Sequence, residues 1–434
     1  MHVLNGINIY EKLFLTTNFY FSVGSELAYY LTLLFPLIYV WVIYKVRITE
    51  NLFKKSVIFL SMITALPIFV GDIFVFGKST YSGYTTASIF SWFTGIYDVY
   101  LPKTLASKFF FAEGNTIGIL LIMLLPLLYY YLLKSKNREK ILLSLLIIIH
   151  SLSMIIIGTR VGTFGAILVP SCVLVVFIFL SILKKEKFKM TFVLSLIVMI
   201  IMSAGIYTFS PAYRNQLIDA ENDAFVREDN YIIDDHSDGL SEGENLIPGS
   251  QEFNHFYINY FEDNAFLISS TPKQYYLEYY YYQHDPKFWV DYIFNYTLEE
   301  RINGRQFENI FIKYKWEILN TYERMFGTSY STLMNGSIVL ERDFAQQYYS
   351  FGYIGGTLLV LPWLLLFANF AMKVIFGFKK YWNMKYIMIM FSFSLAIVCG
   401  YISGHTIDQF ITSMFISLLV GYLFVSMSGE NNND

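Results

Sequence analysis

The residues whose types and spacing best suit chemistry lie between positions 301 and 356, in a polar stretch that leads directly into an apolar run. A carboxylate can take a proton from an attacking hydroxyl group, and a guanidinium can hold a phosphate through two parallel hydrogen bonds. The candidates are Glu341 and Asp343 as catalytic carboxylates, and Arg305 and Arg342 as cations that bind an anionic substrate.

These residues also have plain structural interpretations. Acidic side chains at the start of a helix complement the helix dipole. The pair Glu341 and Asp343 has the oxygen ligands that a divalent ion takes, but two carboxylates alone are a weak metal signal, and we predict no metal ion. Arg305 falls in the first turn of an expected helix, where backbone N–H groups and a guanidinium together form a site for an anion.

Three further polar residues stand at the expected outer ends of membrane helices. Arg160 lies in a turn between Gly158 and Gly162, where it either reaches the membrane surface or faces a phosphate. Asn115 either forms a hydrogen bond between helices or contributes to a site. His405 has Asp408 one helical turn further on, and a structural and a catalytic histidine are both consistent with this spacing.

The charge of the chain changes along the long polar segment before these residues. Between 210 and 300 there are 18 acidic residues against 4 basic ones, whereas between 301 and 348 there are 5 against 6. The segment therefore becomes locally basic where it rejoins an apolar run. Cations at such a boundary suit the anionic head group of a lipid-linked substrate.

The elements that position these residues are transmembrane helices. Of the 434 residues, 55% are hydrophobic and only 15% are charged, which is too apolar for a soluble domain. We predict an all-α, polytopic integral membrane protein with about 9 to 11 transmembrane helices. The clear runs are 22–44, 56–76, 109–133, 141–158, 163–183, 190–209, 349–374, 386–403 and 406–427. The segment 12–24 is short for a span and is either an interfacial helix or part of a tenth crossing.

Basic connections alternate with connections that contain few basic residues, and basic connections face the cytoplasm. This alternation predicts that the connection 210–348 lies outside the cell and that the C-terminus lies inside. We therefore expect an N-terminal membrane bundle of about 6 helices, 1–209, one large extracytoplasmic loop, 210–348, and about 3 C-terminal membrane helices, 349–434.

Two parts of the loop have a readable pattern. Residues 272–289 are dense in Tyr and Trp, which suits either the core of a small domain or a platform on which sugars stack. Apolar residues spaced by three and four then predict one amphipathic helix from about Asn303 to Gly327. This face comprises Phe307, Phe311, Tyr314, Ile318, Tyr322 and Met325.

Four separated motifs together resemble one family. GTR at 158–160, NGR at 303–305, ERDFAQQYYSFGYIGG at 341–356 and GH at 404–405 are similar to motifs of the O-antigen ligase-like membrane proteins, as is Asn115 before its apolar run. That family includes O-antigen ligases and the O-antigen and capsular polysaccharide polymerases of bacteria. The resemblance extends over about 22–427 in helix order and in these motifs, and it does not cover 210–300.

The resemblance implies a glycosyltransferase with a GT-C-like fold in the bacterial plasma membrane. Its implied donor and acceptor are oligosaccharides on polyprenyl diphosphate, typically undecaprenyl diphosphate, with no metal ion or other cofactor. It also implies that Arg160 and Arg305 hold the diphosphate. A flippase and a chain-length regulator are implied partners, together with the bilayer, and no nucleic acid is expected.

One position departs from the ligase pattern. In the ligase branch, the motif before the Gly-x-x-Gly helix usually starts with His, which is the proposed base, whereas this chain has Glu341 there. The departure favours a polymerase that joins lipid-linked repeat units of a capsule or exopolysaccharide by a single inverting displacement. An en bloc ligase is the first alternative, and a lipid-linked oligosaccharide flippase is the second.

Overall fold

The structure is a computed structural model of the whole chain. It describes residues 1–13, 20–81, 83–95, 102–217, 240–243, 245–268, 271, 273–296, 301, 304–335, 338 and 340–428. Within these ranges the regular elements are helices, and none is a β-strand. This confirms the prediction of an all-α protein.

Nine of the described helices are long and apolar enough to cross a membrane. They are α2 (Val23–Val46), α3 (Glu50–Ile73), α5 (Gly114–Lys134), α6 (Asn137–Ile156), α7 (Arg160–Ile182), α8 (Met190–Tyr207), α17 (Asp343–Phe376), α19 (Met384–Ile402) and α20 (Phe410–Met427). Each corresponds to one predicted run, so the prediction of a polytopic membrane protein is confirmed. The largest shifts are in α3, which starts at Glu50 rather than at 56, and in α17, which starts at Asp343 rather than at 349.

The helices belong to two compact units. Unit 1 contains residues 1–30 and 218–360, and unit 2 contains residues 31–217 and 361–434. Two of the boundaries fall inside α2 and α17, so these helices contribute to both units. The sequence also predicts that residues 210–348 form a loop outside the cell, between the membrane bundles 1–209 and 349–434. The helices alone do not define a side of the membrane, so this division stays a prediction.

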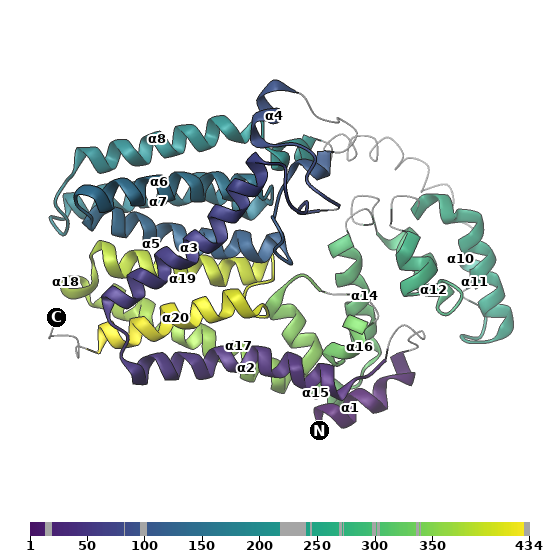
Figure 1. Cartoon of the computed structure of the whole chain (residues 1–434). Helices are drawn as coiled ribbons and strands as arrows, with labels where there is room; N and C mark the ends of the chain where they lie inside the picture. Colours follow the sequence, from purple (N-terminus) through teal and green to yellow (C-terminus); the bar gives the residue numbers. More distant parts are fainter. Residues whose placement is uncertain are drawn as a thin grey trace. The chain divides into compact units, whose positions relative to one another are not determined.

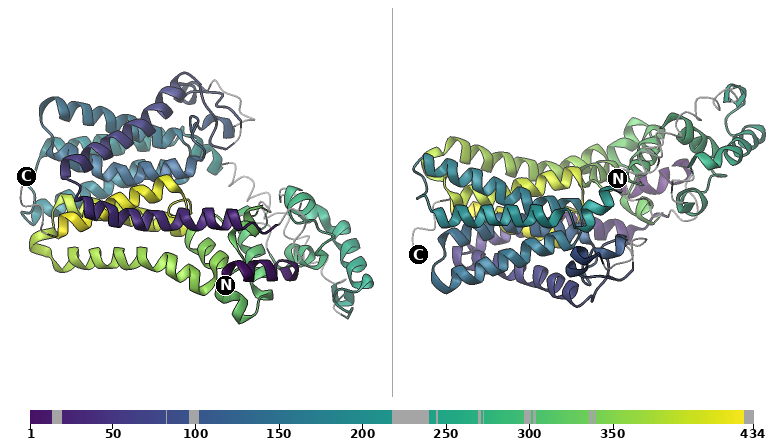
Figure 2. Two further views of the ribbon diagram at one scale, coloured as in Figure 1. Left: turned by 60° about the horizontal axis from the view of Figure 1, so that its bottom comes forward. Right: turned by 90° about the horizontal axis from the view of Figure 1, so that it is seen from above.

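Unit 2 is built around α5. Every residue of its apolar window is buried, because α3, α6, α7, α19 and α20 surround it. In the views of Figures 1 and 2, α5, α6, α7 and α8 run alongside one another. A helix that is apolar on all sides can be the centre of such a bundle, because it has no polar face that needs water. His150 lies between these helices: its imidazole contacts Ser61 Oγ at 2.7 Å and the carbonyl oxygen of Leu121 at 2.9 Å.

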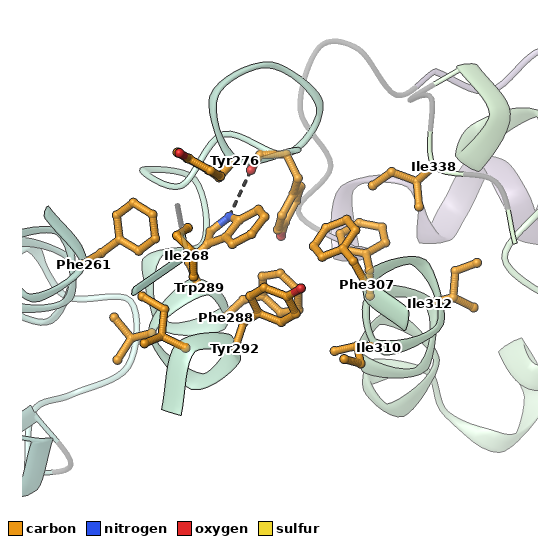
Figure 3. Packing of buried hydrophobic residues seen from close by; sticks show 14 of the residues in the cluster. Phe261, Ile268, Tyr276, Phe288, Trp289, Tyr292, Phe307, Ile310, Ile312 and Ile338 are labelled. Atoms are coloured by element: carbon orange, nitrogen blue, oxygen red, sulfur yellow. Dashed lines mark hydrogen bonds between the residues drawn. The ribbon is translucent and has the colours of Figure 1, made fainter. Parts of the chain in front are cut away.

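Unit 1 has an aromatic core, seen from close by in Figure 3. It is formed by α11 (Gln251–Asn264), α12 (Pro286–Asn295) and α14 (Gly304–Ile318). Trp289 is fully buried, donates a hydrogen bond to the carbonyl oxygen of Tyr280 at 3.0 Å, and stacks on Phe307 at 5.4 Å between ring centroids. Tyr276 and Tyr280 are buried as well. Most of the Tyr- and Trp-rich segment thus serves to pack this unit.

The N-terminal helix belongs to the same unit. α1 (His2–Ile9) packs on α15 (Thr321–Phe326). The Asn5 amide donates hydrogen bonds to the carbonyl oxygens of Gly327 at 2.9 Å and Glu323 at 3.1 Å, and Lys12 pairs with the Glu323 carboxylate at 2.6 Å. Residues 14–19 of the short segment 12–24 lie outside the described residues.

The prediction of one amphipathic helix from Asn303 to Gly327 is wrong. α14 ends at Ile318, and α15 begins at Thr321. Asn320 caps α15, because its side chain accepts from the Glu323 N–H while the Glu323 carboxylate accepts from the Asn320 N–H. This capping box starts a new helix even though the apolar spacing continues. Tyr322 is consequently 55% exposed instead of buried.

Candidate active site

The first component of the site is the start of α14. Phe307 and Phe311 anchor the helix in the aromatic core, and both are fully buried. Arg305 lies in the first turn and is half exposed, which leaves its guanidinium accessible to an anion. The free N–H groups and the dipole of a helix N-terminus favour negative charge at this end.

The second component is the segment that precedes α17. Leu340 is buried, and its N–H donates to Gln346 Oε1 at 3.2 Å. The Gln346 N–H donates to the Arg342 carbonyl oxygen at 2.8 Å, and the Gln346 side chain donates to Ser350 Oγ at 2.8 Å. Gln346 therefore fixes the entry into the helix, and Glu341 projects from this fixed segment.

These two components meet. The Arg305 guanidinium forms an ion pair with the Glu341 carboxylate, which is 31% exposed. Two of the predicted site residues, far apart in the sequence, are thus brought into direct contact within unit 1. Arg342, also a predicted cation, has an exposed side chain, whereas Asp343 is buried at 1% exposure. Glu341 is therefore the more accessible of the two predicted carboxylates.

A break in α17 shapes this region. Gly352 has φ 71° and ψ −173°, so the helix is interrupted there. A Cβ atom at Gly352 would lie 2.5 Å from the carbonyl oxygen of Arg324 and 2.5 Å from the amide nitrogen of Gly327. The Thr328 N–H donates to the Tyr349 carbonyl oxygen at 2.8 Å just before the break. Only glycine permits this close approach of the two backbone segments. The approach holds in place residues 343–351, the part of α17 that lies between Glu341 and the break.

Glu308 is a site residue that the sequence analysis did not identify. It lies on α14 three residues after Arg305, is 9% exposed, and accepts a hydrogen bond from the Tyr275 hydroxyl at 3.5 Å. Burial, and then the negative charge of Glu341, raise the pKa of the Glu308 carboxyl to about 8. Arg305 and the hydrogen bonds from Tyr275 and from the Glu341 backbone lower this pKa, but they do not cancel the increase.

The described part of the chain contains no cluster of three or more His, Cys, Asp or Glu side chains arranged as metal ligands. Around Glu341, the structure places one further carboxyl, Glu308, and one cation, Arg305. Chemically, this arrangement offers a base, a neutral acid and a guanidinium for a phosphate. Independence from metal ions stays a prediction.

The other predicted residues belong to unit 2. Arg160 is exposed and is the first residue of α7. Thr159 caps the helix by accepting from the Gly162 N–H at 3.2 Å, and Gly158 turns the chain with φ 71°. The Tyr81 hydroxyl donates to the Gly158 carbonyl oxygen at 2.7 Å. Local bonds therefore order the turn that precedes Arg160. Arg160 and Gly162 themselves lie in the first turn of α7 rather than in the connection, where the glycine spacing places them.

His405 has an acidic neighbour that the sequence spacing does not reveal. It lies in a non-helical turn with φ 60°, and α20 begins only at Phe410, so Asp408 is not one helical turn away. The His405 imidazole instead lies 3.5 Å from the carboxylate of Glu113 at the start of α5. Asn115 is half-buried in the first turn of that helix. His405 and the start of α5 thus form a second polar cluster, within unit 2.

A family model described as O-antigen ligase like membrane protein matches residues 2–430. The chain belongs to this family. The family that the sequence motifs resemble is thereby confirmed, over nearly the whole chain. No curated protein matches the chain, and no solved structure matches it.

Membership in the O-antigen ligase-like family gives the site its chemical setting. The family consists of membrane enzymes that polymerise or ligate polysaccharides, and lipid-linked glycans are their substrates. This chain is therefore a membrane glycan polymerase or ligase. A sequence signal for Glu308 does exist, since a carboxyl three residues after Arg305 shares its helix face. Its burial depends on tertiary packing, which the spacing alone does not reveal.

Proposed function

We propose that the protein is a polysaccharide polymerase that joins oligosaccharide repeat units carried on polyprenyl diphosphate. The observation that carries the proposal is the contact between Arg305 and Glu341, which brings a cation for the diphosphate beside a carboxylate base. The family supplies the substrate class, and the partial exposure of both side chains supplies access.

The reaction is one displacement at the anomeric carbon of the donor. A hydroxyl oxygen of the acceptor forms the new bond to that carbon, while the bond from the carbon to the diphosphate oxygen breaks. The Glu341 carboxylate takes the hydroxyl proton, which contributes about 10²–10⁴-fold to the rate. The diphosphate leaves with the electron pair, and the Arg305 guanidinium stabilises the charge that develops on it. A single displacement inverts the anomeric centre.

The polymerase assignment rests on position 341. Glu341 stands where the ligase pattern usually has His, with the same spacing to Gly352. Asp343, two residues further on, is buried at 1% exposure, so we expect it to contribute less to the reaction than Glu341. En bloc transfer to another acceptor is the alternative within the family, and the products of the assay distinguish the two.

The proposed setting is the bacterial plasma membrane, with the loop 210–348 on the outer face. The alternation of basic connections supports this orientation. Repeat units reach that face through a flippase, and chain length is set by a separate regulator. The proposed diphosphate-binding role of Arg160 rests on its exposed position at the start of α7, directly after the turn at Gly158 in unit 2.

Purified protein supplied with lipid-linked single repeats should produce a ladder of lipid-linked polymer. Glu341→Gln should lower turnover by about 10²–10⁴-fold while donor binding is retained, because only the proton acceptor is lost. Asp343→Asn should have a milder effect. The matched control is Glu317→Gln, an exposed carboxylate on α14.

Two results would contradict the proposal. Wild-type turnover in Glu341→Gln would show that the base lies elsewhere. Transfer of preformed chains to an acceptor that is not lipid-linked, without extension of single repeats, would identify a ligase. In a deletion strain, mass spectrometry should find single repeats on the carrier outside the cell, whereas repeats trapped inside would identify a flippase.

A further inference from the structure

Glu308 combines three properties that a surface helix residue does not have. It shares a face of α14 with Arg305, three residues earlier. The residue is buried, with 9% of its surface exposed. Its carboxyl group accepts hydrogen bonds from the Tyr275 hydroxyl and from the backbone of Glu341, which lie on two other segments of unit 1. A buried carboxyl group with neutral hydrogen-bond donors is costly to ionise, so its charge state is sensitive to these neighbours.

The groups that face Glu308 come from three elements. Arg305 lies on the same helix, and Glu341 lies on the segment before α17. Tyr275, from the short helix Tyr275–Tyr279, donates to Oε1 and stays neutral, because burial and the nearby carboxylates raise its pKa. The cluster therefore contains one fixed cation and two carboxyl groups.

The charge of this cluster depends on Glu308 alone near neutral pH. With a pKa of about 8, Glu308 is mostly a neutral acid at pH 7. Arg305 and Glu341 then balance each other, and the cluster carries no net charge. Above pH 8 the second carboxylate forms, and the cluster becomes net negative in a buried environment, where like charges repel strongly.

We propose that Glu308 is a positioning residue that admits the donor's diphosphate only while it is neutral. In this state Arg305 can exchange the Glu341 carboxylate for the diphosphate, which also frees Glu341 to act as the base. When Glu308 ionises, its charge holds Arg305 and repels the diphosphate. This inference rests on the proposed function, because it names the control of donor binding at the same site.

The expected size of the effect follows from the neutral fraction. If only the neutral form binds donor, the apparent dissociation constant equals the intrinsic one divided by that fraction, and it should rise about tenfold between pH 7 and pH 9. The increase should appear in the KM for the donor, and kcat at saturating donor should change much less. A residue that only packs the helix would not produce this split.

The experiment measures binding and turnover of wild type and Glu308→Gln from pH 6 to pH 9.5. The binding probe is a polyprenyl-diphosphate-linked monosaccharide, a diester whose own charge is fixed over this range. Glu308→Gln should bind the probe at pH 9 about as well as at pH 7, because glutamine imitates the neutral acid. Glu317→Gln, on the same helix, should keep the wild-type pH dependence. Lys315, whose pKa burial lowers to about 8, is unchanged in all these variants.

A second variant keeps the inference testable if Glu308→Gln does not fold. Glu341→Gln removes the charge that raises the pKa of Glu308 and leaves Arg305 without that anion. The loss of probe binding should therefore begin at a lower pH than in wild type. Infrared spectroscopy gives a third measurement, since the protonated carboxyl band of wild type should disappear as the pH passes 8 and should be absent from Glu308→Gln.

The outcomes separate the inference from the proposed function. An alkaline loss of probe binding that is identical in wild type and Glu308→Gln would overturn the inference, even if polymer forms normally. An unshifted loss in Glu341→Gln would overturn it as well. Wild-type protein that binds the probe with the expected pH dependence but never extends lipid-linked repeats would refute the polymerase proposal and leave the role of Glu308 intact.

Discussion

Exchanging the two charges of the Arg305–Glu341 pair tests whether this contact serves chemistry or only stability. The double variant Arg305→Glu with Glu341→Arg keeps an ion pair between the same two positions. If the pair only joins α14 to the start of α17, the exchange should restore what either single variant loses. If the residues have the proposed roles, the exchange places a base where the phosphate binds and a cation where the proton is taken.

The structure sets the size of each effect. Arg305 and Glu341 are 50% and 31% exposed, so solvent screens the pair. Such pairs contribute about 0–1 kcal/mol to the free energy of unfolding. Each single variant should therefore unfold within a few degrees of wild type. Loss of the base should lower turnover by about 10²–10⁴-fold, an effect of roughly 3–5 kcal/mol on the activation free energy at 1.36 kcal/mol per tenfold.

The assay compares turnover of lipid-linked repeats with the unfolding temperature in the same detergent, for both single variants and the double variant. The control exchange is Lys287→Asp with Asp291→Lys, a half-exposed pair at 2.6 Å on α12 in the same unit. This control should leave turnover unchanged. Recovery of turnover in the Arg305–Glu341 exchange to near the wild-type rate would refute the catalytic reasoning, because neither group would then have its proposed role.

Four further predictions follow from other parts of the chain. Gly352→Ala should lower the unfolding temperature, since alanine at φ 71° and ψ −173° costs about 1–3 kcal/mol before the contact with Gly327 is counted. Gly205→Ala, with nothing within 4 Å, should not lower it in the same melting assay. Activity should survive excess chelator; loss of activity that magnesium or manganese restores would make Glu341 and Asp343 metal ligands. In a variant without Cys172 and Cys399, membrane-impermeant reagent should label Gln283→Cys in intact cells and Ser135→Cys only after permeabilisation. Glu341→His should recover part of the turnover lost in Glu341→Gln, with activity falling below about pH 6.5 as the imidazole takes up a proton.

Much of the fold was accessible from the sequence because a bilayer imposes length and apolarity on each span. All nine predicted runs correspond to helices of the structure. The spacing of Phe307 and Phe311 likewise predicted the buried face of α14. These features depend on periodicity and composition, which are local properties of the chain.

The parts that were missed depend on contacts between distant segments. The end of α14 is decided by the capping box of Asn320 rather than by apolar spacing. The His405 imidazole lies near the carboxylate of Glu113, which is distant in the sequence. The raised pKa of Glu308 depends on its burial and on the charge of Glu341, which lies on a different segment of the chain. Sequence spacing within one helix contains no information about such approaches.

The ion pair also bears on why a carboxylate stands at position 341. A base that is paired with a guanidinium is weak, because the cation favours its charged form and lowers its affinity for protons. If the donor's diphosphate takes Arg305 from Glu341, donor binding and activation of the base become one event. An unprotonated imidazole at this position would not compete for the guanidinium in this way. The carboxylate of Glu341 would then be a stronger base when donor is bound than when the site is empty. This difference limits the unproductive activation of water in the absence of donor.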